Sequence, residues 1–212
     1  MTALAETIGK RDTRTAALTM DALLVITGSL FVAGMAQLYV KLPFTPVPIT
    51  GQTLAVLLVG GALGARRGGS SLALYLGWIA IGLPFAAEGK SGAELLKIST
   101  ASGGYLWGFV LAAVLVGWLA ERGWDRDVGR AIGAMLLGSI VIYVMGVTWL
   151  AAAIDVPVAT PSEELRASIG CGSALECGLY PFVIGDVLKL LLAAVTLPAA
   201  WRILGNKDSV TD

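Results

Sequence analysis

Long, almost uncharged apolar runs dominate this sequence and restrict what it can fold into. They fall at about residues 20–40, 52–65, 70–86, 103–120, 131–153 and 180–204, and the charged residues gather between them. Crossing a bilayer core takes about 20 mostly apolar residues in a helix. Only 14% of the 212 residues are charged, against about 25% in soluble domains, which is too few to cover a globule in water. We expect an all-α membrane protein with six transmembrane helices.

The second and third runs are short, but the basic turn at residues 64–69 separates them. In lipid the backbone must make its hydrogen bonds within the spanning segment, which favours a helix bundle. We therefore divide the chain into a cytoplasmic N-terminal segment, residues 1–19, a six-helix domain, residues 20–204, and a cytoplasmic tail, residues 205–212. The first segment is polar and of mixed charge, unlike a cleaved signal peptide.

Basic residues are distributed unevenly between the two sets of helix ends. Ten Lys and Arg lie near the chain termini and in the turns at 66–67 and 122–130, and four lie in the other connections. Cytoplasmic loops carry the excess of Lys and Arg. The count predicts a multi-pass protein of the cell membrane with both termini inside, and with segments 41–51, 87–102 and 154–179 outside.

The composition argues against several classes of function. The chain has no His, which removes Ser–His catalysis and most zinc sites, and two Cys are too few for a metal cluster. A formal charge of zero gives no basic footprint for nucleic acid. The run Glu88 to Ser91 resembles the end of a phosphate-binding loop, but Pro84 stands where that motif needs Gly. We expect no enzyme activity, no cofactor and no metal.

One pair of charges lies inside an apolar run. Asp186 and Lys189 are three residues apart, so they share a helix face, about two turns from the outer end of the last run. Charges inside a membrane are costly and usually functional. Lys189 can hold a carboxylate and Asp186 can accept N–H groups from an amide or ureido group. The alternative is an internal ion pair that only neutralises itself.

Three outer segments carry further candidates. Residues 42–53 contain three prolines, which make a stiff segment, either a preformed lid or a simple connection, and Thr50 and Gln52 are able to cap the next helix. Residues 99–109 open the fourth helix with glycines that either expose N–H groups to a ligand or form a packing corner. Cys171 and Cys177 lie on the outer side, where a disulfide is permitted; free thiols are the alternative.

Three motifs together resemble the BioY family, the biotin-binding S components of energy-coupling factor (ECF) transporters. They are Pro43 to Leu54, Gly103 to Leu106, and Pro181-Phe182-x-x-Gly185-Asp186-x-x-Lys189, and the similarity extends from about residue 20 to residue 204. The resemblance implies a six-helix S-component fold that binds biotin, a vitamin with a carboxylate and a ureido ring, near the outer surface. On this basis we expect the substrate-binding residues to be Phe44, Thr45, Gln52, Gly104, Tyr105, Asp186 and Lys189.

The resemblance also implies partners, namely a membrane coupling protein (T component) and two cytoplasmic ATPases. The docking motif of two alanines expected on the first helix is not clean here, and Ser29 and Ala33 are the nearest small pair. Two alternatives remain open: an S component for another vitamin, or a stand-alone biotin carrier. A cation such as Lys189 in the site argues against thiamine, which is itself cationic. Lone carriers usually show internal repeats, and we see no convincing repeat.

Overall fold

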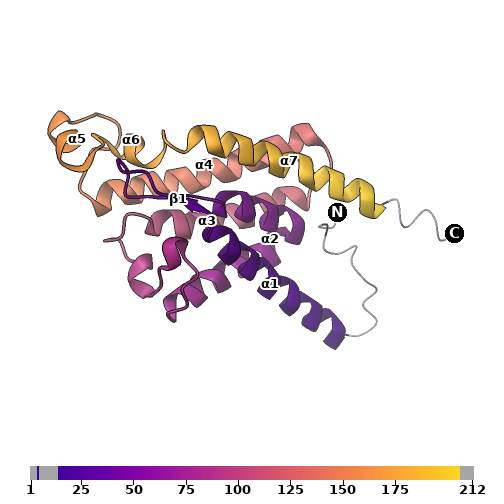
Figure 1. Cartoon of the computed structure of the whole chain (residues 1–212). Coiled ribbons are helices and arrows are strands. Elements are labelled where there is room, and N and C mark those ends of the chain that lie inside the picture. Colours follow the sequence, from indigo (N-terminus) through magenta and orange to yellow (C-terminus); the bar gives the residue numbers. More distant parts are fainter. Residues whose placement is uncertain (1–3, 5–13, 206–212) are drawn as a thin grey trace.

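The computed structural model describes residue 4 and residues 14–205, and most of them are helical. The long helices are α1 (Arg14–Ala36), α2 (Gln52–Ala80), α3 (Gly103–Ala120), α4 (Val128–Ala153) and α7 (Val183–Gly205). They form a bundle in which α3 packs between α2 and α4, α1 packs on α2, and α7 packs on α4 and α2 (Figure 1).

The short elements gather at one end of the bundle, which we call the loop end (Figure 1). They are the antiparallel strands β1 (Tyr39–Val40) and β2 (Ile49–Thr50), the 3-10 helices η2 (Ala87–Gly89) and η3 (Ala93–Leu96), and the short helices α5 (Glu163–Ile169) and α6 (Ala174–Gly178). The first described turn of α1 and the last turn of α7 lie at the opposite end (Figure 1). The loop end therefore collects three connections that are far apart in the sequence.

Helix α2 is a hairpin of two arms. At Gly64 the backbone takes φ 82° and ψ 175°, which is not helical. The Nε2 of Gln52 lies 2.7 Å from the Oη of Tyr75, whereas a straight helix would separate residues 23 positions apart by roughly 35 Å. The predicted separation of two runs near residue 64 is therefore present. The predicted boundaries are wrong, because residues 65–69 are helical and the second arm ends at Ala80 instead of residue 86.

Glycines allow the close packing at the centre of the bundle. A Cβ on Gly60 would lie 2.8 Å from the Ala113 carbonyl oxygen, and one on Gly68 would lie 3.0 Å from the Cα of Gly60. Small residues let membrane helices approach in this way. The small pair Ser29 and Ala33 on α1 is also buried, so it faces this bundle instead of a partner.

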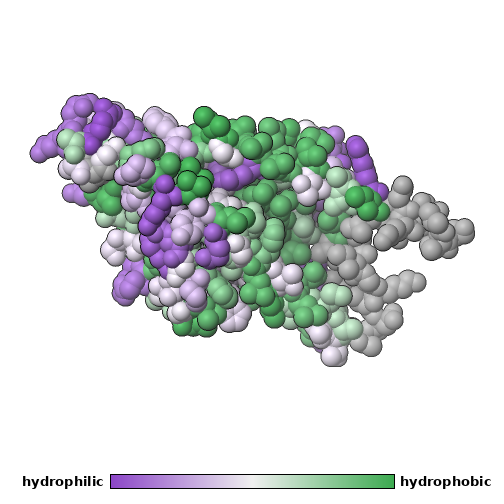
Figure 2. Space-filling model, in the orientation of Figure 1, coloured by the Kyte–Doolittle hydropathy of each residue, from purple (hydrophilic) through white to green (hydrophobic). Residues whose placement is uncertain are grey.

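The flanks of the bundle are apolar. Among the described residues, four helices are long and apolar enough to cross a membrane: α1, α3, α4 and residues Val183–Ile203 of α7. Large side chains such as Ile184 and Leu188 on α7 are 87% and 61% exposed. Figure 2 shows hydrophobic residues over this flank, with hydrophilic ones concentrated at the loop end. Exposed apolar surface of this extent marks contact with a membrane or a partner, and the expected helical membrane-protein class is confirmed.

Two helices near the chain ends begin at other residues than the apolar runs do. Helix α1 begins at Arg14, so the polar segment predicted over 1–19 is already helical at its end. Helix α7 begins at Val183 and places Asp186 in its first turn, nearer the helix end than the two turns expected. Residues 1–3 and 5–13 of the predicted N-terminal segment, and residues 206–212 of the predicted tail, lie outside the described part of the chain.

Candidate functional site

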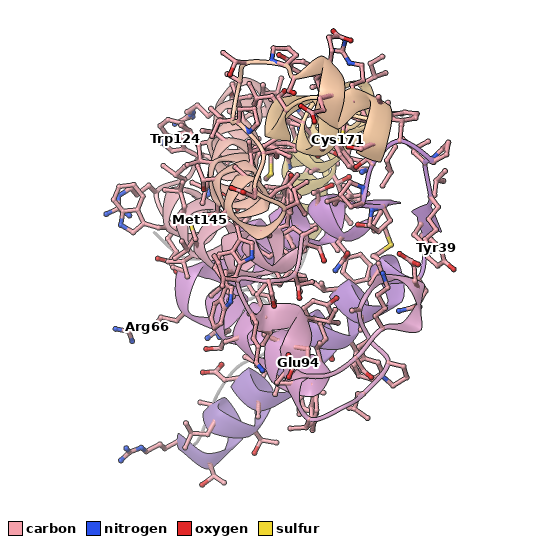
Figure 3. The ribbon with its side chains drawn as sticks, turned by 90° about the vertical axis from the view of Figure 1, so that its left-hand side faces the viewer. Tyr39, Arg66, Glu94, Trp124, Met145 and Cys171 are labelled. Atoms are coloured by element: carbon pink, nitrogen blue, oxygen red, sulfur yellow. A yellow bond between two sulfur atoms is a disulfide. The ribbon has the colours of Figure 1, made fainter. Side chains whose placement is uncertain are left out.

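A cavity opens into the bundle at the loop end. The empty space of the cavity together with its solvent-filled mouth amounts to about 750 Å³. Its walls are mainly apolar side chains, and a few polar groups converge on it from α2, α4 and α7. Figure 3 views the molecule from this end, where the labelled residues Tyr39, Glu94 and Cys171 mark three of the connections that meet there. The cavity wall itself takes residues from segments 46–53, 86–90, 95–109, 142–143 and 182–189. The cavity is therefore enclosed by segments that are remote in the sequence.

Lys189 lines the cavity, and all of its donors are engaged. Its Nζ donates to Asp186 Oδ1 at 2.7 Å, to the Thr50 carbonyl oxygen at 2.7 Å and, more weakly, to Thr53 Oγ1 at 3.3 Å. An ammonium group has three N–H donors. Lys189 therefore ties α7 to the start of α2, and a ligand anion would have to displace one of these bonds.

Asp186 also lines the cavity and retains capacity to accept. Its Oδ1 accepts from Lys189 and, at 3.2 Å, from Thr53. Its Oδ2 accepts only from the hydroxyl of Tyr143, at 2.5 Å, and each carboxylate oxygen has about two acceptor sites. The ring of Tyr143 meets that of Tyr105 edge to face, with centroids 6.3 Å apart. Asp186 and Lys189 thus form an ion pair with each other and also line the cavity, so the structure combines the two alternatives considered for this pair.

Gln52 lines the cavity through a buried hydrogen-bond chain. Its Nε2 donates to Tyr75 Oη, and its Oε1 accepts from Thr50 Oγ1 at 3.1 Å. Tyr75 in turn donates to the Phe85 carbonyl oxygen at 3.1 Å. Thr50 Oγ1 accepts from the backbone N–H of Gln52, the first residue of α2, at 3.2 Å. The N-cap position itself is Gly51, which provides no side-chain cap. The chain connects the start of α2 with the loop after its second arm.

Tyr105 lines the cavity with its ring, but Gly104 does not reach the cavity. The Tyr105 hydroxyl is buried and donates to the Gly178 carbonyl oxygen at 2.8 Å. A Cβ on Gly104 would meet the Trp149 side chain and the Met145 carbonyl oxygen. Of the two interpretations of the glycines that open α3, the structure therefore fits the packing corner, because the indole of α4 occupies the space beside them.

Phe44 and Thr45 do not line the cavity either. They belong to the lid, which we define as residues 41–48 between β1 and β2. The Thr45 hydroxyl donates to the Cys177 carbonyl oxygen at 2.5 Å, and Phe44 is 43% exposed. The next lid residues, 46–48, do line the cavity. The stiff segment therefore lies over the site, and its middle residues supply the contact.

Several residues that line the cavity were not predicted from the sequence, among them Thr53, Tyr143, Glu88 and Lys90. Tyr143 is a polar residue in an apolar helix, a signal that was available. Glu88 and Lys90 belong to the run that was discarded as a phosphate-binding loop. Glu88 pairs with Lys41 of the lid and, at 3.1 Å, with Lys90. The hydrogen bond from Lys41 is the main reason why the pKa of Glu88 lies below its ordinary value.

Cys171 and Cys177 form a disulfide between the loop after α5 and helix α6. Their Cα atoms are 5.5 Å apart, within the usual range of about 4.4–6.8 Å. Within residues 14–205 and residue 4, no group of three or more His, Cys, Asp or Glu side chains has a metal-binding arrangement. The chemistry that this site offers is hydrogen bonding and charge pairing to a small polar solute.

Comparison with known proteins gives consistent matches. The model of the BioY family matches residues 8–206. The biotin transporter BioY of Rhizobium etli is 35% identical over 163 residues, which cover 74% of this chain and 79% of that protein. The biotin transporter BioY of Thermotoga maritima is 35% identical over 157 residues, which cover 74% of this chain and 82% of that protein.

A solved structure has the same fold. The crystal structure of the S-component for biotin from an ECF-type ABC transporter matches with a TM-score of 0.69 and 24% sequence identity, over 91% of this chain and 95% of that one. At this identity the likeness concerns the fold. The match of the family model over nearly the whole chain, together with relatives above one third identity, assigns the family. This chain belongs to the BioY family.

Proposed function

We propose that this protein takes up biotin, as the substrate-binding S component of an ECF transporter. The observation that carries the proposal is a mainly apolar cavity with one polar cluster, formed by Asp186, Lys189, Tyr143 and Thr53, at its wall. Biotin presents a ureido ring and a carboxylate on an apolar frame, so it needs apolar walls and few polar partners. The family members named above are biotin transporters.

The contacts favour one orientation of biotin. Asp186 Oδ2 has a spare acceptor site, which suits a ureido N–H. Lys189 has no spare donor. The carboxylate of biotin, which was expected to bind Lys189, is therefore proposed to bind Lys90. Lys90 lines the cavity, its side chain is 54% exposed, and its Nζ donates to Glu88 Oε1 at 3.1 Å. At the mouth of the cavity the biotin carboxylate would stay hydrated on its solvent side and form an ion pair with Lys90 on the other.

The remaining predicted residues take supporting roles in this proposal. The Tyr105 ring and the Gln52 amide form walls, Phe44 and Thr45 belong to the lid, and Gly104 allows α3 to pack against Trp149. Tyr105 and Gln52 would thus contact the ligand, whereas Phe44, Thr45 and Gly104 would act without touching it. Substitutions at Gln52 and Tyr105 should therefore lower affinity more than a substitution at Phe44, which is half exposed.

We also propose that six helical segments cross the membrane, with the loop end outside and both chain termini in the cytoplasm. The two arms of α2 are two of the six, and the domain would then run from α1 to α7. Tryptophans support this placement, because they favour membrane interfaces. Trp78, Trp107 and Trp149 lie near the loop end, and Trp118, Trp124 and Trp201 lie towards the other end. Arg122 and Arg126 stack on Trp118 and Trp201, as expected at a cytoplasmic surface.

The proposed energy source is external to this chain. A T component and two cytoplasmic ATPases would drive reorientation of the loaded subunit, and this chain would perform no catalysis itself. Affinity purification from native membranes tests this part: co-purifying ATPases support the S-component assignment, and biotin uptake in cells without any ECF ATPase would establish the stand-alone carrier instead.

Binding of radiolabelled biotin to the purified protein tests the substrate. We expect saturable binding in the nanomolar to micromolar range that excess thiamine or riboflavin does not displace. Asp186→Asn should weaken it at least about tenfold, the loss of one charge-assisted hydrogen bond. Asp127→Asn is the matched control, because Asp127 caps α4 at the other end of the bundle and Asn caps equally well. Absence of saturable binding, or displacement by another vitamin, would refute the biotin assignment.

A further inference from the structure

The segment closed by the disulfide, with the residues that flank it (170–178), contacts the lid and the cavity wall through consecutive backbone groups. The carbonyl oxygen of Cys177 accepts from the hydroxyl of Thr45 in the lid, and that of Gly178 accepts from the hydroxyl of Tyr105 in the cavity wall. The two distances are 2.5 Å and 2.8 Å. One short stretch of backbone therefore positions both the cover and the side of the cavity.

The other end of the same segment also contacts the lid. A Cβ on Gly170, beside Cys171, would lie 3.0 Å from the Cα of Phe44. Phe44 and Thr45 are neighbours, so consecutive lid residues lie against the two ends of the segment, whose cysteine Cα atoms the disulfide holds 5.5 Å apart. Cys177 lies in α6, a helix of five residues (Ala174–Gly178), so the disulfide joins this short helix to the loop before it.

Thr45 also connects the Cys177 carbonyl group to Val47, a lid residue that lines the cavity. Thr45 Oγ1, while donating to Cys177, accepts from the backbone N–H of Val47 at 3.2 Å. Val47 is buried, lines the cavity and packs in the same core as Cys171 and Cys177. A hydroxyl that donates on one side and accepts on the other fixes the turn of the lid over the site.

We infer that the Cys171–Cys177 disulfide and Thr45 are positioning elements that hold the lid closed over the bound solute. This inference rests on the proposed biotin function, but it concerns the lid and not the choice of substrate. The disulfide fixes the Cys177 carbonyl group, and Thr45 donates a hydrogen bond to it. Val47, whose N–H donates to Thr45, is thereby held in the cavity wall. The expected signature is in the rate of ligand release, since affinity differences within one interface arise mostly from dissociation.

The test compares wild type with the double variant Cys171→Ala/Cys177→Ala and with Thr45→Val, which removes a hydroxyl at constant shape. We expect biotin to dissociate about tenfold faster from the double variant and about fivefold faster from Thr45→Val, with association changed less, as for a lost hydrogen bond. In the double variant Thr45→Val should add little, because coupled sites are not additive. Thr148→Val is the control, since its hydroxyl bonds to the Val144 carbonyl oxygen in its own helix.

A second measurement needs no ligand. Hydrogen exchange at the Val47 amide should speed up in the double variant and in Thr45→Val, and should not change in Thr148→Val. Unchanged exchange at Val47 together with unchanged biotin release would overturn the inference. Wild type that fails to bind biotin, with faster Val47 exchange in both variants, would instead refute the substrate and leave the lid contact supported.

Discussion

The buried pair of Asp186 and Lys189 allows stability and binding to be separated. Lys189→Met removes the ammonium and keeps a long unbranched side chain. Asp186, only 9% exposed, then loses its 2.7 Å partner, and the Thr50 carbonyl oxygen loses its donor. Removing one partner of a buried pair costs about 3–5 kcal/mol. Because Tyr143 and Thr53 still donate to Asp186, we expect the lower end, about 3 kcal/mol, or roughly a hundredfold in the unfolding equilibrium.

The double variant Asp186→Asn/Lys189→Met is the decisive comparison. It removes the orphaned charge, so we expect it to recover about 2 kcal/mol of the lost stability, since coupled residues interact by about 0.5–3 kcal/mol. Biotin binding should not recover, because the charged acceptor for the ureido group is gone. The double variant would then recover stability without recovering binding.

The free energy of unfolding can be measured by titrating the protein from a mild detergent into SDS, and binding by equilibrium dialysis with labelled biotin. Lys97→Met is the matched control: Lys97 pairs with Glu94 at the same spacing, but both side chains are largely exposed, and such pairs contribute about 0–1 kcal/mol. If Lys189→Met is no more destabilising than Lys97→Met, or if the double variant is less stable than the single, the reasoning about a buried pair is refuted.

Three further outcomes follow from the cavity and the bundle. Lys90→Met should weaken biotin about tenfold but leave a neutral biotin amide unaffected, as for one lost ion pair with a ligand; equal losses for both ligands would argue against a carboxylate at Lys90. The bond from Lys41 holds the pKa of Glu88 below its ordinary value of 4.5, so the lid contact should persist at neutral pH and be lost only below that value. Release of the neutral biotin amide, which has no carboxylate to titrate, should accelerate there in wild type, whereas Glu88→Gln should release it equally fast above and below that pH. Gly68→Leu should destabilise by about 1–3 kcal/mol through overpacking, measured in SDS, while Gly77→Leu, which faces open space, should change little.

Hydropathy predicted the helices well where they are apolar throughout. The run over 103–120 coincides with α3, whereas α1 begins six residues before the predicted start because Arg14 and its neighbours form a polar helical turn. The hairpin of α2 was partly visible, since the basic pair beside Gly64 interrupts an apolar pattern. Its tightness was not, because it depends on Gly68 meeting Gly60.

The site was predictable where a charge stands alone in an apolar helix, as for Asp186 and Lys189. It was not where common residues act together: Tyr143 and Thr53 come from different helices and gain meaning only when both reach one carboxylate. Gly104 was assigned to the ligand because a glycine that exposes N–H groups and one that admits Trp149 look the same in sequence. Only the packing of α4 distinguishes them.

The shortness of the two arms of α2 shortens the path of the solute. At 1.5 Å per residue, residues 52–63 span roughly 18 Å, against a hydrocarbon core of about 30 Å. In the proposed membrane placement, with the Gly64 turn at the inner boundary of that core, Thr53 would lie about 12 Å below the outer boundary. A solute held beside Thr53 would then already have crossed over a third of the apolar barrier by diffusion through the open mouth. The proposed energy-driven step would have only the inner part left to traverse.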